Sequence, residues 1–100
     1  MNKRNIILIG MPGAGKSSVG VILAKVLGYE FIDTDLVIQH REKRLLREII
    51  ADEGNEGFLA IENEVNATLE ADKSVIAPGG SAIYGKEAME HFKEIGTIVY

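Results

Sequence analysis

The chain has 100 residues, of which 46% are hydrophobic and 26% are charged, and its formal net charge is −4. This composition predicts one small globular domain with an ordinary core and excludes a disordered chain. The acidic balance excludes a general electrostatic attraction for nucleic acid or an anionic membrane surface, and the absence of cysteine excludes disulfides and thiolate metal sites.

The N-terminus is basic, but the apolar run that follows it, residues 6–9, is too short for a signal peptide or a membrane span. Together with the absence of cysteine, this pattern favours a cytoplasmic protein. We expect a monomer whose partner is a small-molecule substrate, with no nucleic acid and no membrane among its partners.

A phosphate-binding loop is predicted between the first strand and the first helix. Residues 6–9 are typical of a buried strand, and residues 17–27 repeat apolar side chains at a helical period. Between them, Gly10 to Ser17 fits the pattern G-x-x-x-x-G-K-[ST], whose glycines let consecutive N–H groups surround a phosphate at the positive end of a helix. The alternative is a glycine-rich turn with an exposed lysine, and the strand-loop-helix context disfavours it.

This loop implies a nucleotide site with a metal ion. Lys16 would reach the β- and γ-phosphates of ATP, and the Ser17 hydroxyl would hold Mg²⁺. The residues predicted to bind the ATP phosphates are Gly13, Ala14, Gly15, Lys16, Ser17 and Ser18.

Two carboxylates end the second predicted strand. Gly28 is expected to end the preceding helix in the left-handed conformation. The apolar pair 31–32 then leads a strand that runs into Asp33 and Asp35. Because ligands bind at the carboxyl ends of strands in open α/β sheets, one acid can serve the metal and the other the acceptor. The alternative is a solvated turn, or Asp35 as the N-cap of a helix that begins at Leu36.

The middle of the chain is predicted to be helical. Residues 39–47 are locally basic but lack interleaved aromatic side chains, so we expect the solvated face of two short helices rather than a nucleic-acid contact. Residues 44–53 are amphipathic, and residues 58–69 resume a helical period. Gly54 and Gly57 bracket a turn between these two helices.

A pair of glycines follows the third predicted strand, which spans residues 74–77. The N–H groups of Gly79 and Gly80 could meet a substrate oxygen. The alternative is a tight turn into the next helix, which is predicted over residues 86–94.

The fold class is α/β, with a parallel sheet, helices on both faces and right-handed crossovers, in the three-layer arrangement of phosphate-loop NTPases. The strands are predicted near residues 5–10, 29–35, 74–78 and 97–100. Doubly wound nucleotide-binding domains generally need more chain, and this sequence stops on a strand-like run. We therefore expect a chain that is truncated at its C-terminal side.

These motifs together resemble the shikimate kinase family of small phosphate-loop kinases. The resemblance covers essentially the whole chain and rests on residues 10–20, 31–35, 57–62 and 79–80. It implies transfer of the ATP γ-phosphate to a hydroxyl of shikimate, giving shikimate 3-phosphate, with ATP and Mg²⁺ as cofactors.

The resemblance also implies a role for each matching residue. Asp33 joins Ser17 at Mg²⁺, while Asp35 holds the acceptor hydroxyls and can take the proton. The catalytic residues are then Lys16 and Asp35, and the substrate-binding residues are Asp35, Gly79 and Gly80.

Three departures from the family pattern bear on the acceptor. The family usually has Phe-Arg-x-x-Glu, whose arginine grips the shikimate carboxylate, and this chain has Leu59 in place of the arginine. Loss of that ionic clamp would cost about 1.5 to 3 kcal/mol of acceptor binding. Ser81 stands at the third position of the family's glycine triplet. The family's mobile lid would follow Tyr100, so a molecule that ended there should show little or no turnover.

We therefore expect residues 1–100 to be the N-terminal portion of a single phosphate-loop kinase domain without its lid. Two other functions stay open because of Leu59. One is a kinase that acts on another small polyhydroxylated acceptor, and the other is a non-catalytic nucleotide-binding module with a regulatory or interaction role.

Overall fold

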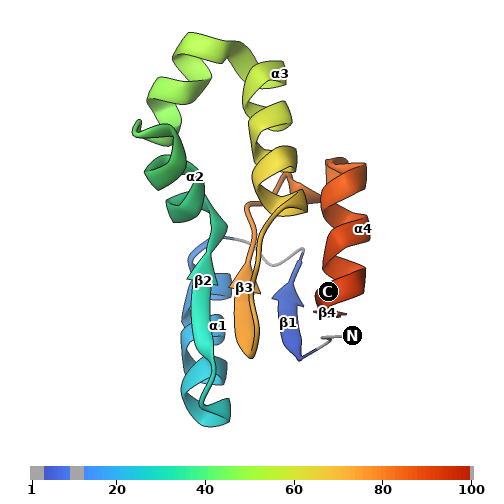
Figure 1. Cartoon of the computed structure of the whole chain (residues 1–100). Helices are drawn as coiled ribbons and strands as arrows, with labels where there is room; N and C mark the ends of the chain where they lie inside the picture. Colours follow the sequence, from blue (N-terminus) through green and yellow to red (C-terminus); the bar gives the residue numbers. More distant parts are fainter. Residues whose placement is uncertain (1–3, 10–12, 100) are drawn as a thin grey trace.

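In the computed structural model, which describes residues 4–9 and 13–99, the strands form a four-stranded parallel sheet in the order β2-β3-β1-β4 (Figure 1). Side chains are described for residues 4–9 and 18–99. The strands are β1 (Asn5–Leu8), β2 (Glu30–Asp33), β3 (Ser74–Ala77) and β4 (Gly96–Val99). The helices are α1 (Gly13–Leu27), α2 (Thr34–Glu42), α3 (Leu46–Ala67) and α4 (Lys86–Ile95), with a 3-10 turn, η1 (Ala82–Tyr84).

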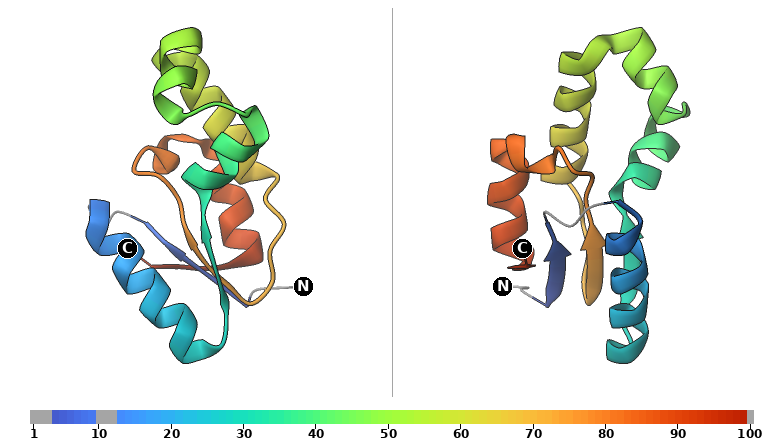
Figure 2. Two further views of the ribbon diagram at one scale, coloured as in Figure 1. Left: turned by 90° about the vertical axis from the view of Figure 1, so that its left-hand side faces the viewer. Right: turned by 180° about the vertical axis from the view of Figure 1, so that it is seen from behind.

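Helices cover both faces of the sheet, as the sequence predicts. Successive strand residues point to opposite faces, so Ile7 and Leu8 enter different cores. Leu8 packs with Val75 and with Ala24 of α1. On the other face, Ile7 packs with the buried Phe92 of α4. Figure 2 shows α1 and α4 on opposite sides of the strands.

The predicted elements agree with the observed ones apart from some boundaries. The third strand is confirmed at residues 74–77, and Gly28 has the left-handed conformation predicted for it, with φ 71°. The predicted turn from Gly54 to Gly57 is narrower than expected, because Gly54 alone leaves the helical region, at φ 76° and ψ 174°, and kinks α3. Gly57 lies within the helix.

The second strand ends earlier than predicted, and this changes the role of its acids. Asp33, not Asp35, is the N-cap of α2, and Asp35 lies inside the first turn of that helix. The alternative in which Asp35 is the N-cap is therefore wrong, as is the predicted extension of the second strand to residue 35. Asp33 is the last residue of β2 paired with β3, opposite Ala77, so the chain turns into the helix as soon as the pairing stops.

Helices α2 and α3 extend past the carboxyl ends of the strands (Figure 1). They pack on each other through a small core of their own, in which Ile38, Ile49 and Val65 are buried. This core is separate from the two that line the sheet. The pair of helices therefore lies beside the edge of the sheet from which the segments after β1, β2 and β3 emerge.

The buried side chain of Asn5 ties the start of β1 to its neighbours. Its amide nitrogen donates to the carbonyl oxygens of Ala71 at 3.0 Å and Ile95 at 2.9 Å, and its oxygen accepts from the N–H of Ser74 at 3.0 Å. The contacts reach the segment before β3 and the end of α4, so one side chain joins both flanking elements to the central strand. A buried amide that makes three hydrogen bonds holds its neighbours in register.

We predict that Asn5→Ala lowers the free energy of unfolding by about 3 kcal/mol, because it leaves the buried N–H of Ser74 without its acceptor. Urea titration measures the change. The control is Asn55→Ala, which removes an exposed asparagine on α3. Its free energy of unfolding should stay within about 0.5 kcal/mol of that of the unchanged protein. Equal stability of the two variants would contradict the role given to Asn5.

Candidate functional site

The predicted site residues lie at one edge of the sheet, at or just after the carboxyl ends of β1, β2 and β3. Strands β1, β2 and β3 are parallel, so the segments that follow them emerge together at their carboxyl ends (Figure 1). This is the edge at which open α/β sheets bind ligands. The topology alone therefore brings the predicted phosphate loop, the two aspartates and the glycine pair to the same end of the molecule.

The phosphate loop is only partly described. Residues 10–12 and the side chains of residues 13–17, including Lys16 and Ser17, lie outside the described part of the chain. The backbone of residues 13–18 forms the first turn of α1, and Ser18 is exposed. A helix N-terminus directly after a strand is the setting that anion capture by N–H groups requires. The phosphate contacts of Gly13, Ala14, Gly15, Lys16, Ser17 and Ser18 stay predictions.

Asp33 has a structural role in addition to the one predicted for it. Its Oδ1 accepts a hydrogen bond from the backbone N–H of Asp35 at 2.9 Å, which caps α2. Within the described residues, its Oδ2 makes no hydrogen bond or ion pair and is open to a further ligand. A carboxylate oxygen of this kind fits Mg²⁺, which takes one or two protein oxygens together with phosphate oxygens and water.

Asp35 and the buried Glu62 converge on Gly79. A Cβ added to Gly79 would lie 2.9 Å from Asp35 Oδ1 and 2.9 Å from Glu62 Oε2. Real Cβ atoms do not approach oxygen atoms so closely, so only glycine fits between the two carboxylates without displacing one of them. Three segments distant in the sequence therefore meet at one point. Gly80 is exposed, and a Cβ there would meet nothing within 4 Å.

The Ser81 hydroxyl donates a hydrogen bond to Glu62 Oε1 at 2.7 Å. Sequence reasoning treated Ser81 only as a departure from the glycine triplet and missed this contact. A signal was present, because Glu62 follows Phe58 by four residues and precedes Val65 by three, on the apolar face of its helix. A glutamate on that face, only 2% exposed, needs a donor nearby.

Leu59 lines an apolar pocket of about 400 Å³ beside this convergence. Its side chain is 37% exposed, so it faces the pocket and not the core. The lining residues are Ile50, Asn55, Phe58, Leu59, Ser81 and Tyr84. None of these lining residues is a cation. A second pocket that Leu59 lines, of about 280 Å³, includes Lys86, so a cation is present nearby.

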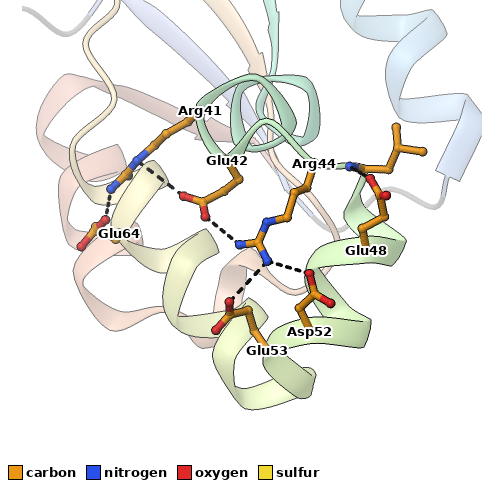
Figure 3. Close-up of polar contacts among 8 residues, drawn as sticks. Arg41, Glu42, Arg44, Glu48, Asp52, Glu53 and Glu64 are labelled. Carbon is orange, nitrogen blue, oxygen red and sulfur yellow. Dashed lines mark hydrogen bonds and ion pairs between the residues drawn. The ribbon is translucent and has the colours of Figure 1, made fainter.

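Arg41 and Arg44 join α2 to α3 through ion pairs (Figure 3). Arg41 pairs with Glu64 of α3. The Arg44 guanidinium contacts three carboxylates at 3.0, 3.1 and 3.3 Å, those of Glu42, Asp52 and Glu53. The hydrogen bonds to Glu42 and then Asp52 raise the pKa of Arg44 above its ordinary value. Arg41 thus pairs across the two helices, and Arg44, in the connection between them, contacts carboxylates of both.

The described residues also bear on two other kinds of feature, a clustered metal site and a membrane span. Among residues 4–9 and 13–99, no group of three or more histidine, cysteine, aspartate or glutamate side chains is placed to hold a metal ion. In the same part of the chain, the helices are too short or too polar to cross a membrane. The cytoplasmic location and the monomeric state stay predictions.

The parallel sheet with helices on both faces, and the phosphate-loop motif in the sequence between β1 and α1, are typical of the phosphate-loop NTPase fold. A family model described as shikimate kinase matches residues 12–100, and the chain belongs to this family. The resemblance inferred from the motifs is therefore confirmed.

Relatives of known sequence and structure agree with this assignment. The chain is 38% identical over 97 residues to shikimate kinase 2 of Yersinia enterocolitica, covering 97% of this chain and 56% of that protein. The solved shikimate kinase of Acinetobacter baumannii, in complex with shikimate, matches with a TM-score of 0.85 and 37% identity, covering 96% of this chain and 54% of that one. For shikimate kinase of Aquifex aeolicus the TM-score is 0.78 at 34% identity, with coverage of 94% and 56%. The chain spans about half the length of these relatives.

The contact at Gly79 predicts a difference between two neighbouring glycines. Gly79→Ala forces the new Cβ against two carboxylate oxygens and should lower the free energy of unfolding by about 1–3 kcal/mol. Gly80→Ala puts its Cβ into open space and should change the free energy of unfolding by less than about 0.5 kcal/mol. Chemical denaturation of both variants makes the comparison, and a Gly80 variant as destabilised as the Gly79 variant would argue against the close approach.

Proposed function

We propose that the whole protein transfers the γ-phosphate of ATP to a hydroxyl of shikimate, forming shikimate 3-phosphate. Membership of the shikimate kinase family supports this proposal, as does the similarity to a relative solved with shikimate bound. The observation in this chain that carries it is the convergence of Asp35 and Glu62 on Gly79 at the carboxyl edge of the sheet. A carboxylate beside exposed glycine backbone can hold a hydroxylated substrate from two sides.

Each residue of the site would contribute to positioning or to charge neutralisation, which phosphoryl transfer needs more than covalent chemistry. Lys16 and the N–H groups of residues 13–18 bind the phosphates of ATP. Ser17 and Asp33 would hold Mg²⁺, which when bound neutralises charge on the β- and γ-phosphates. Asp35 orients the acceptor hydroxyl and can receive its proton.

A second candidate is a kinase for a polyhydroxylated acceptor that lacks the carboxylate of shikimate. The observation that favours it is Leu59, which lines an apolar pocket at the position where the family pattern has an arginine. An uncharged acceptor could contact this apolar pocket without burying a carboxylate that has no partner.

The test is a coupled ADP-release assay on the full-length protein with MgATP, with and without shikimate. We expect release that depends on shikimate and that falls by at least about 10³-fold in Lys16→Ala, because the loop lysine contacts the transferred phosphate. ATP binding without shikimate-dependent release would exclude shikimate as the acceptor. A screen of uncharged polyhydroxylated compounds would then test the second candidate.

Leu59 gives a sharper prediction for the acceptor. In Leu59→Arg the guanidinium would enter the pocket, one helical turn from Glu62, and the KM for shikimate should fall about tenfold or more because a charge-assisted pair becomes available. Leu59→Gln, which has a polar side chain without charge, is the matched control and should change KM by less than about threefold. Equal effects of the two substitutions would show that the shikimate carboxylate does not face position 59.

A further inference from the structure

The glycine segment after β3 has little to hold it in place by itself. Gly79 and Gly80 have no side chains to pack, and a Cβ at Gly80 would find nothing within 4 Å. One hydrogen bond closes the turn, from the N–H of Ala82 to the carbonyl oxygen of Gly79 at 3.0 Å. Glycine backbone has the largest conformational freedom to lose, so a substrate that binds to it would have to order it.

The buried Glu62 is the group of α3 that contacts this segment. Its Oε1 accepts from the Ser81 hydroxyl at 2.7 Å, the short distance of a charge-assisted hydrogen bond. Its Oε2 lies 2.9 Å from the position a Gly79 Cβ would take. Both oxygens of one carboxylate therefore meet the turn, one at its first residue and one at its third.

We propose that Ser81 and Glu62 are positioning residues that fix the backbone of Gly79 and Gly80 beside Asp35, so that the acceptor hydroxyl meets a pre-ordered site. This inference rests on the proposed function. Ser81 is the first residue after the glycine pair with a side chain, and its hydroxyl bonds this segment to α3. A glycine or an alanine at position 81 could not donate this bond.

The burial of Glu62 explains why the residue at position 81 has to donate a hydrogen bond. Glu62 is only 2% exposed, and a buried carboxylate needs hydrogen-bond donors to offset its lost hydration. The bond to Ser81 therefore serves the carboxylate and the turn at once. Its loss would leave Glu62 with one donor fewer and would free the segment that faces the acceptor.

The experiment compares Ser81→Ala with Ser81→Thr, which keeps the hydroxyl, in the full-length protein. Thr68→Ala is the matched control, because within the described residues the Thr68 hydroxyl bonds to the carbonyl oxygens of Glu64 and Val65 in the last turn of α3 and to no other group. We expect Ser81→Ala to raise the KM for shikimate about 10- to 100-fold, as loss of a hydrogen bond to a charged group does, while the KM for ATP changes less than twofold. Ser81→Thr should recover most of the loss, and Thr68→Ala should change neither KM.

A second readout, amide hydrogen exchange measured by NMR, does not depend on turnover. In Ser81→Ala the N–H groups of Gly79 and Gly80 should exchange at least about tenfold faster, while those of residues 74–77 keep their rates. Unchanged exchange and an unchanged KM for shikimate would overturn the positioning role even if the protein is a shikimate kinase. So would a parallel rise in both KM values with a lower melting temperature, which a merely structural role predicts. If exchange responds as expected but shikimate supports no ADP release, the positioning of the turn stands and the proposed acceptor fails.

Discussion

The close approach of Gly79 to two carboxylates is the constraint on which the site depends. Asp35 comes from the first turn of α2, Glu62 from the part of α3 that follows its kink, and Gly79 from the loop after β3. A side chain at position 79 would separate them, so the absence of one lets backbone and carboxylates share the same small volume. Carboxylates with little exposure need hydrogen-bond donors to offset their lost hydration. For Glu62, one of those donors is Ser81.

The rest of the fold holds these three segments in place. Parallel pairing of β3 with both β1 and β2 fixes where each strand ends, and therefore where each loop begins. Asn5 joins β1 to the segment before β3 and to the end of α4. The α2–α3 core and the interhelical pairs of Arg41 and Arg44 keep Glu62 on the same side as Asp35. Exposed ion pairs are individually weak, so the apolar core contributes most of this cohesion.

Two residues combine structural and chemical roles. Asp33 caps α2 with one carboxylate oxygen and leaves the other open, so the same side chain can begin the helix and serve a metal ion. Ser81 completes a turn and satisfies a buried acid. Leu59, in contrast, lines its pocket with apolar surface. The phosphate-loop motif of the sequence therefore keeps the family pattern, whereas position 59 departs from it.

The sequence by itself determined the strands β1 and β3, the helix after the phosphate loop, the fold class and the family, because hydrophobic periodicity and glycine spacing are local properties. It did not determine which aspartate caps α2, since β2 ends where its pairing with β3 ends, at Asp33 opposite Ala77. It also could not reveal that Glu62 and Ser81, which are 19 residues apart, form a hydrogen bond. Contacts between distant segments depend on how helices pack on the sheet, and that packing is decided by the whole tertiary structure.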